Sequence, residues 1–357
     1  MLMVLGIGLL HSSGEPSRSF EETYIQRIFE YNDRNTDGEL VEKEVAPWRW
    51  LRISQLDHDH SGGISREEFG KEKVLYLETK GERKLNLHYK ETKEESLYLD
   101  LYYPEGVQGD VPVLVYTHGG GWAAGDKQGA AMGSMAQVFK ATLKEGIAVA
   151  SVNYRRYRKG KVYATSCVED SKDAMRYLAK NAKELGVDPH QMLTFGNSAG
   201  GHLSLMNALS PRSVYTGDEG LAEAEYTIVG GVSWYGWTNL LEKRLFIKNG
   251  KQTHGTAARV IPPGASDAER EKILTEMSPS TYLNAESPPI LCVHGDQDQV
   301  VILEHSLYLQ ELAQEVGARV NVIKVKGAGH GFHSEETSPP ASEIYEQVVR
   351  FLVDCVK

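Results

Sequence analysis

The stretch Leu193-Thr194-Phe195-Gly196-Asn197-Ser198-Ala199-Gly200-Gly201-His202 determines how the rest of the chain is interpreted. Apolar residues at 192–195 predict a buried strand, and those at 203–209 predict a helix. Between them, Gly-x-Ser-x-Gly is typical of a nucleophile elbow, where a strained turn exposes a serine hydroxyl. Glycines at 196 and 200 would let the strand and helix backbones approach closely. The alternative is an ordinary serine in a glycine-rich turn.

A second glycine-rich stretch, His118-Gly119-Gly120-Gly121-Trp122, follows an apolar run at 111–116. Glycines after an early strand allow backbone N–H groups to approach a tetrahedral intermediate, as in an oxyanion hole. Two such motifs in this order, each after a predicted strand, favour a serine hydrolase over an ordinary turn.

On these residues the chain resembles the α/β-hydrolases of the hormone-sensitive-lipase and BD-FAE-like esterase group. The resemblance extends from about residue 96 to the C-terminus, but Asn197 departs from the Asp or His common in the two branches. The remaining matching stretches are Val152-Asn153-Tyr154-Arg155, His294-Gly295-Asp296-Gln297-Asp298 and Gly329-His330-Gly331-Phe332.

The alternation of apolar runs with helical patterns predicts an α/β fold with a doubly wound, mostly parallel sheet. We expect this hydrolase domain to cover residues 79–357, with an insertion at 211–282 that partly covers the site. Predicted edge strands are 84–89 and 97–103. The other predicted strands are 111–116, 147–153, 192–195, 228–235, 289–294 and 320–325, and the predicted helices include 168–185, 304–315 and 343–353.

In this fold the chain order of the catalytic groups is serine, acid, histidine. The resemblance implies Asp298 as the acid, because Asp296 directly follows a glycine and suits a turn. It implies His330 as the base, with His333 as the competitor.

Three backbone N–H groups are expected to bind the oxyanion: those of Gly120, Gly121 and Ala199. Trp122 is expected to bind substrate and, with the aromatic cluster at 234–237, to shape its pocket. We expect His118, His202 and His294 to be structural.

Two acidic loops precede the hydrolase domain, at 33–44 and 57–68. Each fits the twelve-residue EF-hand pattern, with oxygen side chains at positions 1, 3, 5 and 12 and glycine at position 6. Hard oxygen ligands suit Ca²⁺, which we expect to be structural, whereas catalysis needs no cofactor. The predicted ligands are Asp33, Asn35, Asp37, Glu39 and Glu44 in the first loop, and Asp57, Asp59, Ser61, Gly63 and Glu68 in the second.

These loops define a predicted calcium module at residues 20–78, which could also bind a protein partner. Position 8 is apolar in both loops, Leu40 and Ile64, as a small shared β-bridge requires. Only residues 45–56 separate the loops, which leaves room for one shared helix. Val41 at position 9 of the first loop predicts unequal affinities.

The composition excludes several classes of function. A net charge of -10 over 357 residues argues against nucleic acid and anionic membranes as partners. Three distant cysteines form neither a disulfide framework nor a metal pattern. The apolar residues 1–10 are too short to span a bilayer. We interpret residues 1–19 as a signal-peptide remnant or a disordered N-terminus, which favours a secreted or periplasmic location.

The sequence therefore predicts a serine esterase acting on small esters or acylated carbohydrates. The resemblance implies short acyl groups, such as acetyl or feruloyl esters of polysaccharides. Two alternatives stay open: an arylformamidase or peptidase-like amide hydrolase, and a non-catalytic binding module on the same fold.

Overall fold

The computed structural model describes residues 20–357 except 46–49, 51–52, 71–73, 249–250 and 253–256. The chain forms two compact units, Met1–Glu72 and Lys73–Lys357. The expected boundary at residue 78 is therefore too late. Leu77 is fully buried in the core of the second unit, and the Leu75 N–H donates to Gln128 at 2.7 Å. Residues 1–19, interpreted as a signal-peptide remnant or a disordered N-terminus, and much of the shared helix expected at 45–56 lie outside the described residues.

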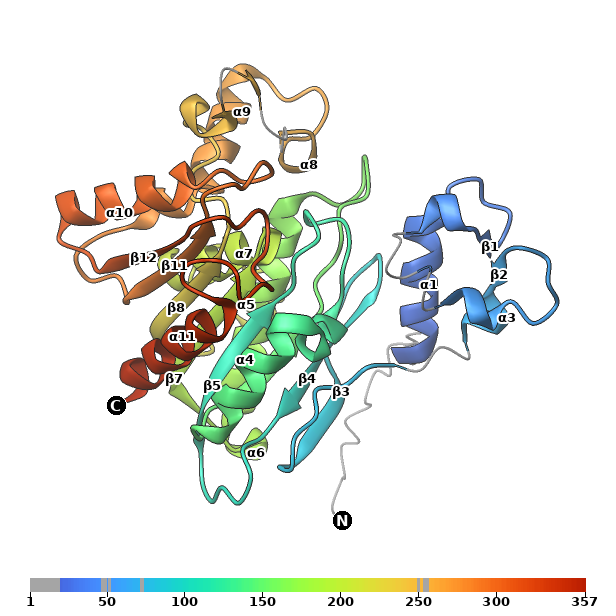
Figure 1. Cartoon of the computed structure of the whole chain (residues 1–357), viewed down its shortest axis with the longest axis horizontal. Helices are drawn as coiled ribbons and strands as arrows, with labels where there is room; N and C mark the ends of the chain where they lie inside the picture. The colour runs from blue at the N-terminus through green and yellow to red at the C-terminus, as the bar shows by residue number, and fades with distance from the viewer. Residues whose placement is uncertain (1–19, 46–49, 51–52, 71–73, 249–250, 253–256) are drawn as a thin grey trace, which may run out of the picture. The chain divides into compact units, whose positions relative to one another are not determined.

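An eight-stranded sheet forms the centre of the second unit, with strand order β12-β11-β8-β7-β5-β6-β4-β3 (Figure 1). The pairs β3–β4 and β4–β6 are antiparallel, and the other neighbours are parallel, as the sequence predicted. The strands are β3 (Arg83–Glu91), β4 (Ser96–Tyr102), β5 (Val111–Thr117), β6 (Ala148–Val152), β7 (Val187–Asn197), β8 (Ile228–Trp234), β11 (Ile290–Gly295) and β12 (Val320–Val325).

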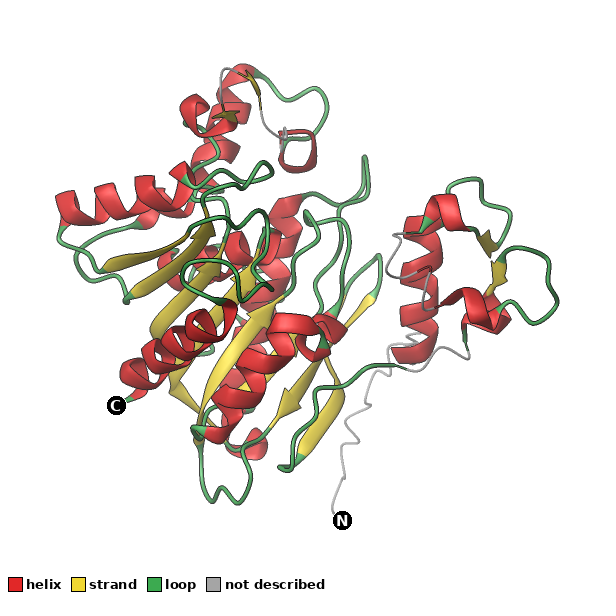
Figure 2. Cartoon of the chain, in the orientation of Figure 1, coloured by secondary structure: helices red, strands yellow, loops and turns green. Residues whose placement is uncertain are grey.

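Helices cover both faces of this sheet (Figure 2). On β5, Leu114 and Tyr116 pack in one apolar cluster, while Val113 and Val115 pack in another. Burial on both faces explains why the central strands are continuous apolar runs rather than alternating ones. The first cluster includes residues of α4 (Gly133–Lys144) and α11 (Ala341–Val356). The opposite face is covered by α5 (Ala164–Lys180), α7 (Ala199–Leu209) and α10 (Glu304–Val316).

The helix expected at 168–185 is divided in two. α5 ends at Lys180, and the short α6 (Ala182–Leu185) follows Asn181. The backbone of Asn181 is not helical, with φ −104° and ψ 17°, and its side-chain amide donates to the Tyr177 carbonyl. A side chain that satisfies a terminal carbonyl ends the helix there.

The insertion expected at 211–282 contains β8 and a series of short elements. α9 (Asp267–Glu276) begins at a capping box between Ser266 and Glu269. The other elements of this region are η4 (Glu219–Leu221), η5 (Lys243–Phe246), β9 (Ile247–Lys248), β10 (Lys251–Gln252), α8 (Ala257–Val260) and η6 (Pro279–Tyr282).

The first unit is small and has its own core. Phe69 packs against Phe29 in an edge-to-face contact, with ring centroids 5.9 Å apart. Leu40 pairs with Ile64 in an antiparallel ladder, so the predicted bridge between the two loops is confirmed. The elements are α1 (Phe20–Asn32), β1 (Glu39–Leu40), η1 (Glu42–Glu44), η2 (Ser54–Leu56), β2 (Ile64–Ser65) and α3 (Arg66–Phe69).

Among the helices that the structure describes, none combines the length and apolar character needed for a membrane span.

Candidate active site

Ser198 occupies a sharp turn between β7 and α7. Its backbone has φ 55° and ψ −121°, a strained conformation for a residue other than glycine. A Cβ at Gly196 would lie 2.0 Å from the Gly200 carbonyl oxygen, and one at Gly200 would lie 2.0 Å from the Thr117 carbonyl oxygen. Both positions therefore require glycine, and the strand–turn–helix predicted from the sequence is present.

The structure brings Ser198, His330 and Asp298 together in one hydrogen-bonded series. His330 Nε2 lies 2.9 Å from Ser198 Oγ, and His330 Nδ1 lies 2.6 Å from Asp298 Oδ2. In the neutral tautomer that fits this network, Nδ1–H donates to the carboxylate and Nε2 accepts from the serine hydroxyl. This is the arrangement of a nucleophile, a base and an orienting acid.

Asp298 is fully buried at the loop after β11. Its Oδ1 accepts hydrogen bonds from the N–H groups of Val300 and Val301, at 2.8 and 3.1 Å, and His294 Nε2 lies 3.5 Å from Oδ2. Burial alone would raise the pKa of Asp298, but hydrogen bonds from His294 and His330 bring this pKa below its ordinary value. The carboxylate is therefore ionised beside the imidazole.

Asp296, the alternative acid, belongs to the turn instead. Its Oδ1 accepts from the Gly327 N–H at 2.8 Å. The competing base, His333, is held by the Ser134 hydroxyl, with Nδ1 and Oγ 2.6 Å apart. Both contacts agree with the assignment of Asp298 and His330.

The loop after β5 lies against the elbow. The Gly119 N–H donates to Asn197 Oδ1 at 3.1 Å, and the N–H groups of Ala123 and Ala124 close a turn on the Gly120 carbonyl. Within the described residues, no protein acceptor receives the N–H of Gly120 or Gly121. Ala199 opens α7, where backbone N–H groups lack helical partners. These three donors are the ones that the sequence predicted for an oxyanion.

Asn197 joins the elbow to this loop, a role that the sequence analysis missed. Its Oδ1 accepts from both the Gly119 N–H and the Tyr116 hydroxyl, the latter at 3.0 Å. A polar residue directly before the nucleophile was the available signal. Tyr154 adds a further support, since its hydroxyl donates to the His118 carbonyl at 2.6 Å.

The predicted structural histidines are engaged with protein atoms. His118 stacks on Tyr154, with ring centroids 4.2 Å apart, and His202 Nε2 lies 2.8 Å from the Met277 carbonyl oxygen. Burial lowers the pKa of His202 to about 4, so this histidine is neutral near pH 7. His294 contacts the Ser306 hydroxyl at 2.7 Å.

Trp122 and Trp234 are buried in the core, which corrects the expectation that Trp122 binds substrate. The Trp122 side chain is 0% exposed. Its ring stacks on Trp237, with centroids 4.7 Å apart, and meets the His202 ring in an edge-to-face contact. Trp234 is 1% exposed and packs on Phe332, with ring centroids 4.8 Å apart. Large aromatic rings next to residues 118–122, the proposed oxyanion loop, thus serve as its packing support.

The sequence and the fold of this chain have counterparts among known proteins. The sequence matches the BD-FAE family over residues 99–312. The chain belongs to the BD-FAE family.

Curated relatives of this BD-FAE chain include hydrolases from bacteria and plants. It is 27% identical over 300 residues to the probable carboxylic ester hydrolase LipM of Mycobacterium tuberculosis, covering 84% of this chain and 62% of the relative. It is 25% identical to the isoprenylcysteine alpha-carbonyl methylesterase ICME of Arabidopsis thaliana, covering 70% of this chain and 58% of the relative. The chain thus spans about 60% of the length of these proteins.

Solved structures show the same α/β-hydrolase fold. A truncated carbohydrate esterase from gut microbiota aligns with a TM-score of 0.66 at 22% identity, over 80% of this chain and 99% of the other. Thermogutta terrifontis esterase 2 aligns with a TM-score of 0.61 at 24% identity, over 77% of this chain and 94% of the other.

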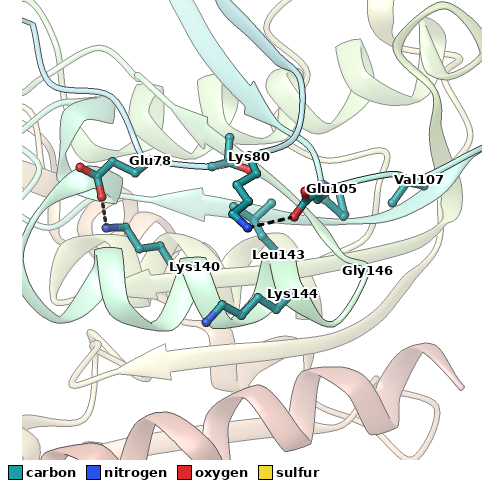
Figure 3. A pocket seen from close by; sticks show the side chains of 10 residues that line it. Glu78, Lys80, Glu105, Val107, Lys140, Leu143, Lys144 and Gly146 are labelled. Carbon is teal, nitrogen blue, oxygen red and sulfur yellow. Dashed lines mark hydrogen bonds and ion pairs between the residues drawn. The ribbon is translucent and has the colours of Figure 1, made fainter.

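A separate depression of about 690 Å³ lies on the side of α4 (Figure 3). Its walls carry the ion pairs Glu78–Lys140 and Lys80–Glu105. None of Ser198, Asp298 or His330 lines it, so it belongs to the surface rather than to the active site.

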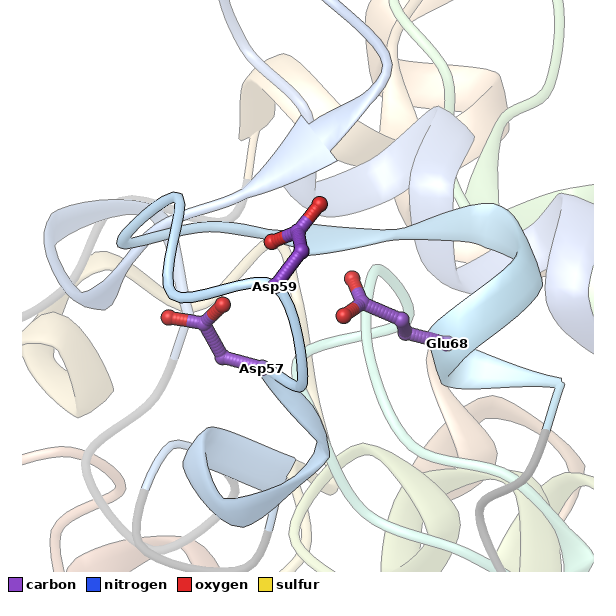
Figure 4. Close-up of side chains that lie close together, drawn as sticks. All are labelled: Asp57, Asp59 and Glu68. Carbon is purple, nitrogen blue, oxygen red and sulfur yellow. The ribbon is translucent and has the colours of Figure 1, made fainter.

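In the first unit, the two acidic loops fold alike. The glycines at position 6, Gly38 and Gly62, have φ 88° and 86°. In the second loop, carboxylate oxygens of Asp57, Asp59 and Glu68 lie within 4.8 Å of one another (Figure 4). In the first loop, buried Asp33 Oδ1 has no hydrogen-bond partner within the described part of the chain. Convergent carboxylates and an orphaned oxygen fit a hard divalent cation.

Proposed function

We propose that this BD-FAE chain is a serine carboxylic ester hydrolase. The observation that carries the proposal is the hydrogen-bonded series Ser198–His330–Asp298. Beside it lie the N–H groups of Gly120 and Gly121, which have no acceptor among the described residues. A hydroxyl, a base and an oriented carboxylate in this order suit acyl transfer.

In the proposed reaction, Ser198 Oγ attacks the ester carbonyl while His330 Nε2 takes its proton. The N–H groups of Gly120, Gly121 and Ala199 stabilise the oxyanion. The C–O bond to the alcohol then breaks, and His330 returns the proton to that alcohol. Water, deprotonated by His330, attacks the acyl-enzyme. The bond between the acyl carbon and Ser198 Oγ then breaks, His330 returns the proton to Oγ, and the carboxylic acid leaves. Asp298 stabilises the imidazolium in both steps.

For the substrate, we propose short acyl esters, including acetyl or feruloyl esters of polysaccharides. The resemblance to feruloyl-esterase-like enzymes favours such esters, and one protein that shares the fold is a carbohydrate esterase. The names of the curated relatives support small esters more generally.

An aryl-ester panel from acetyl to long chain, run beside acetylated polysaccharides, tests this function. Short esters should be hydrolysed fastest, and Ser198→Ala should reduce the rate to the background left by binding and the oxyanion donors. Faster turnover of N-formyl aromatic amines or peptide anilides would assign an amide hydrolase instead. If the wild-type protein hydrolyses none of these substrates, the non-catalytic binding module remains as the interpretation.

We also propose that the two loops of the first unit form an EF-hand pair that holds structural Ca²⁺. Glu44 and Glu68, at position 12 of each loop, already accept backbone N–H groups across their loops, at 3.2 Å from Arg34 and 2.8 Å from His58. Loops of the extracellular type bind Ca²⁺ at roughly 10⁻⁴–10⁻³ M, which would suit a secreted or periplasmic protein.

A further inference from the structure

The insertion contains a strongly basic stretch in an acidic chain. Residues 243–259 contain no aspartate or glutamate, although the whole chain has a net charge of -10. The basic residues of this stretch are Lys243, Arg244, Lys248, Lys251 and Arg259. Such a local excess of one sign attracts ligands of the opposite sign when it borders a site.

Arg259, in α8, contacts the oxyanion loop directly. Its Nη1 donates to the Gly121 carbonyl at 2.9 Å, and a Cβ at Gly121 would lie 2.3 Å from that nitrogen. The side chain is exposed. A guanidinium carries five N–H donors, and this contact uses one of them, so most of its donors remain available.

Lys248, in β9, contacts the loop that carries the acid. Its Nζ donates to the Asp298 carbonyl oxygen at 2.5 Å, and the side chain is half-buried. Within the described part of the chain, no carboxylate forms an ion pair with Lys248 or with Arg259. Two cations without carboxylate partners therefore contact the two loops that flank Ser198.

From this arrangement we infer that the enzyme prefers esters bearing a carboxylate, which Arg259 binds with support from Lys248. The inference rests on the proposed ester hydrolysis and specifies its substrate class. A planar guanidinium matches a carboxylate in a two-point hydrogen-bonded pair, and charge-assisted bonds of this kind are the stronger ones. The carboxylate can belong to the acyl part, as in a dicarboxylic acid monoester, or to the alcohol part, as in an acetylated uronic acid.

Matched substrate pairs test the preference on the full-length protein. Mono-4-nitrophenyl glutarate is compared with 4-nitrophenyl valerate for the acyl side. Acetylated oligogalacturonate is compared with acetylated xylo-oligosaccharide for the alcohol side. We expect a preference of roughly tenfold or more in kcat/KM for the anionic member of one pair, as one charge-assisted bond allows. Raising the salt concentration should reduce it.

Arg259→Gln should remove most of this preference, acting mainly through KM of the anionic ester, and Lys248→Gln should reduce it less. Arg244→Gln is the matched control, because Arg244 lies over the Tyr308 ring, 5.2 Å from its centroid, and contacts neither loop. The control should leave both esters of each pair unchanged.

Two outcomes would overturn the inference while leaving ester hydrolysis intact. One is a wild-type enzyme that hydrolyses neutral and anionic esters equally well. The other is an Arg259→Gln variant that slows both members of a pair by the same factor, which would make Arg259 only a clamp on the oxyanion loop. If no ester is hydrolysed, the proposed function itself fails, and the two failures are thus distinguished.

Discussion

Both carboxylate oxygens of Asp298 are held by hydrogen bonds, so its orientation is fixed as well as its charge. Two backbone N–H groups fix Oδ1, whereas His330 and His294 approach Oδ2 at 2.6 and 3.5 Å. These bonds fix the direction in which the carboxylate faces the imidazole. At the scale of single residues, catalysis should therefore depend on orientation as much as on charge.

Asp298→Asn should lower kcat on a small aryl ester by about four orders of magnitude, because an amide favours the wrong histidine tautomer. Asp296→Asn, the matched control, removes only a turn contact to Gly327 and should change kcat by less than about threefold. Steady-state kinetics of the two purified variants provide the comparison. Equal losses would remove the assignment of the acid.

Acid stability should depend on His202. Burial lowers its folded pKa from 6.5 to about 4. Between these pH values the unfolded chain binds a proton that the folded chain does not, so stability is present above pH 6.5 and is lost as pH falls toward 4. Between pH 6.5 and 4 the wild type should lose up to roughly 3 kcal/mol of unfolding free energy through this histidine. His202→Asn should not show that part of the loss.

Urea unfolding of wild type and of His202→Asn at pH 7, 6, 5 and 4 measures this effect. The difference in unfolding free energy should shrink toward low pH. The buried His305 is present in both proteins. Its pKa is lowered mainly by burial and only in part by the charges of His294 and His202, so most of its contribution cancels. Parallel curves across the whole range would show that His202 does not titrate in this window.

Sequence reasoning found Ser198, Asp298 and His330 because each lies in a short motif with a fixed place in the chain order. It missed Asn197 as a support, since one polar residue before a nucleophile has no distinctive pattern. It could not find the contact between Arg259 and Gly121, because these residues are brought together only by the folded insertion.

Among the elements, the oxyanion loop shows how packing determines a site. Gly120 and Gly121 have φ 118° and 62°, and Trp122 follows at 59°. Three successive positive values turn the chain sharply and direct the Trp122 ring inward, onto Trp237. The sequence predicted the loop from its glycines, but an aromatic ring beside such a loop fits a pocket wall and a packing support equally well. Only the fold distinguishes them.

Trp122→Ala should therefore destabilise the protein by about 3–5 kcal/mol, the usual cost of removing a buried aromatic ring. Acetyl and longer esters should slow by a common factor, because the cavity disturbs the loop rather than a substrate subsite. Thermal melts and paired kcat/KM values measure the two effects. Trp122→Phe, which keeps a ring, should recover most of both. A change in acyl preference would instead mean that Trp122 shapes the substrate pocket.

Element boundaries were predicted less well than element types. β7 starts at Val187, where it pairs with Val111, five residues before the apolar run that predicted it. Residues 188–191 are polar or proline and carry no strand pattern. They fall at the irregularity of the β5–β7 ladder between Val111 and Val113, and the strand continues across them, which local sequence does not report.

For the whole molecule, the division after Glu72 separates two kinds of chemistry. Every group of the proposed active site belongs to the second unit, and every proposed Ca²⁺ ligand belongs to the first. A cation bound only by the folded first unit should therefore stabilise that unit by about 2.7 kcal/mol at a hundredfold excess over Kd.

Glu44→Gln combined with Glu68→Gln should abolish the Ca²⁺-dependent rise in melting temperature and leave kcat on a small aryl ester nearly unchanged. Calorimetry with Ca²⁺ and with chelator gives the first readout, and initial rates give the second. Glu42→Gln, at an exposed position between the ligands, is the control. Loss of kcat on chelation, with the second unit still folded, would mean that Ca²⁺ controls the active site.

The two outermost strands of the large sheet have a consequence for the behaviour of the protein at high concentration. β3 is interrupted by register shifts after Lys84 and after His88, and Asn86 has φ 56°. β12, at the opposite edge, exposes Asn321 and Lys324. Irregular or charged edges offer a poor template for strand addition by another chain. Both borders of the sheet therefore oppose the edge-to-edge self-association that leads to amyloid-like aggregation.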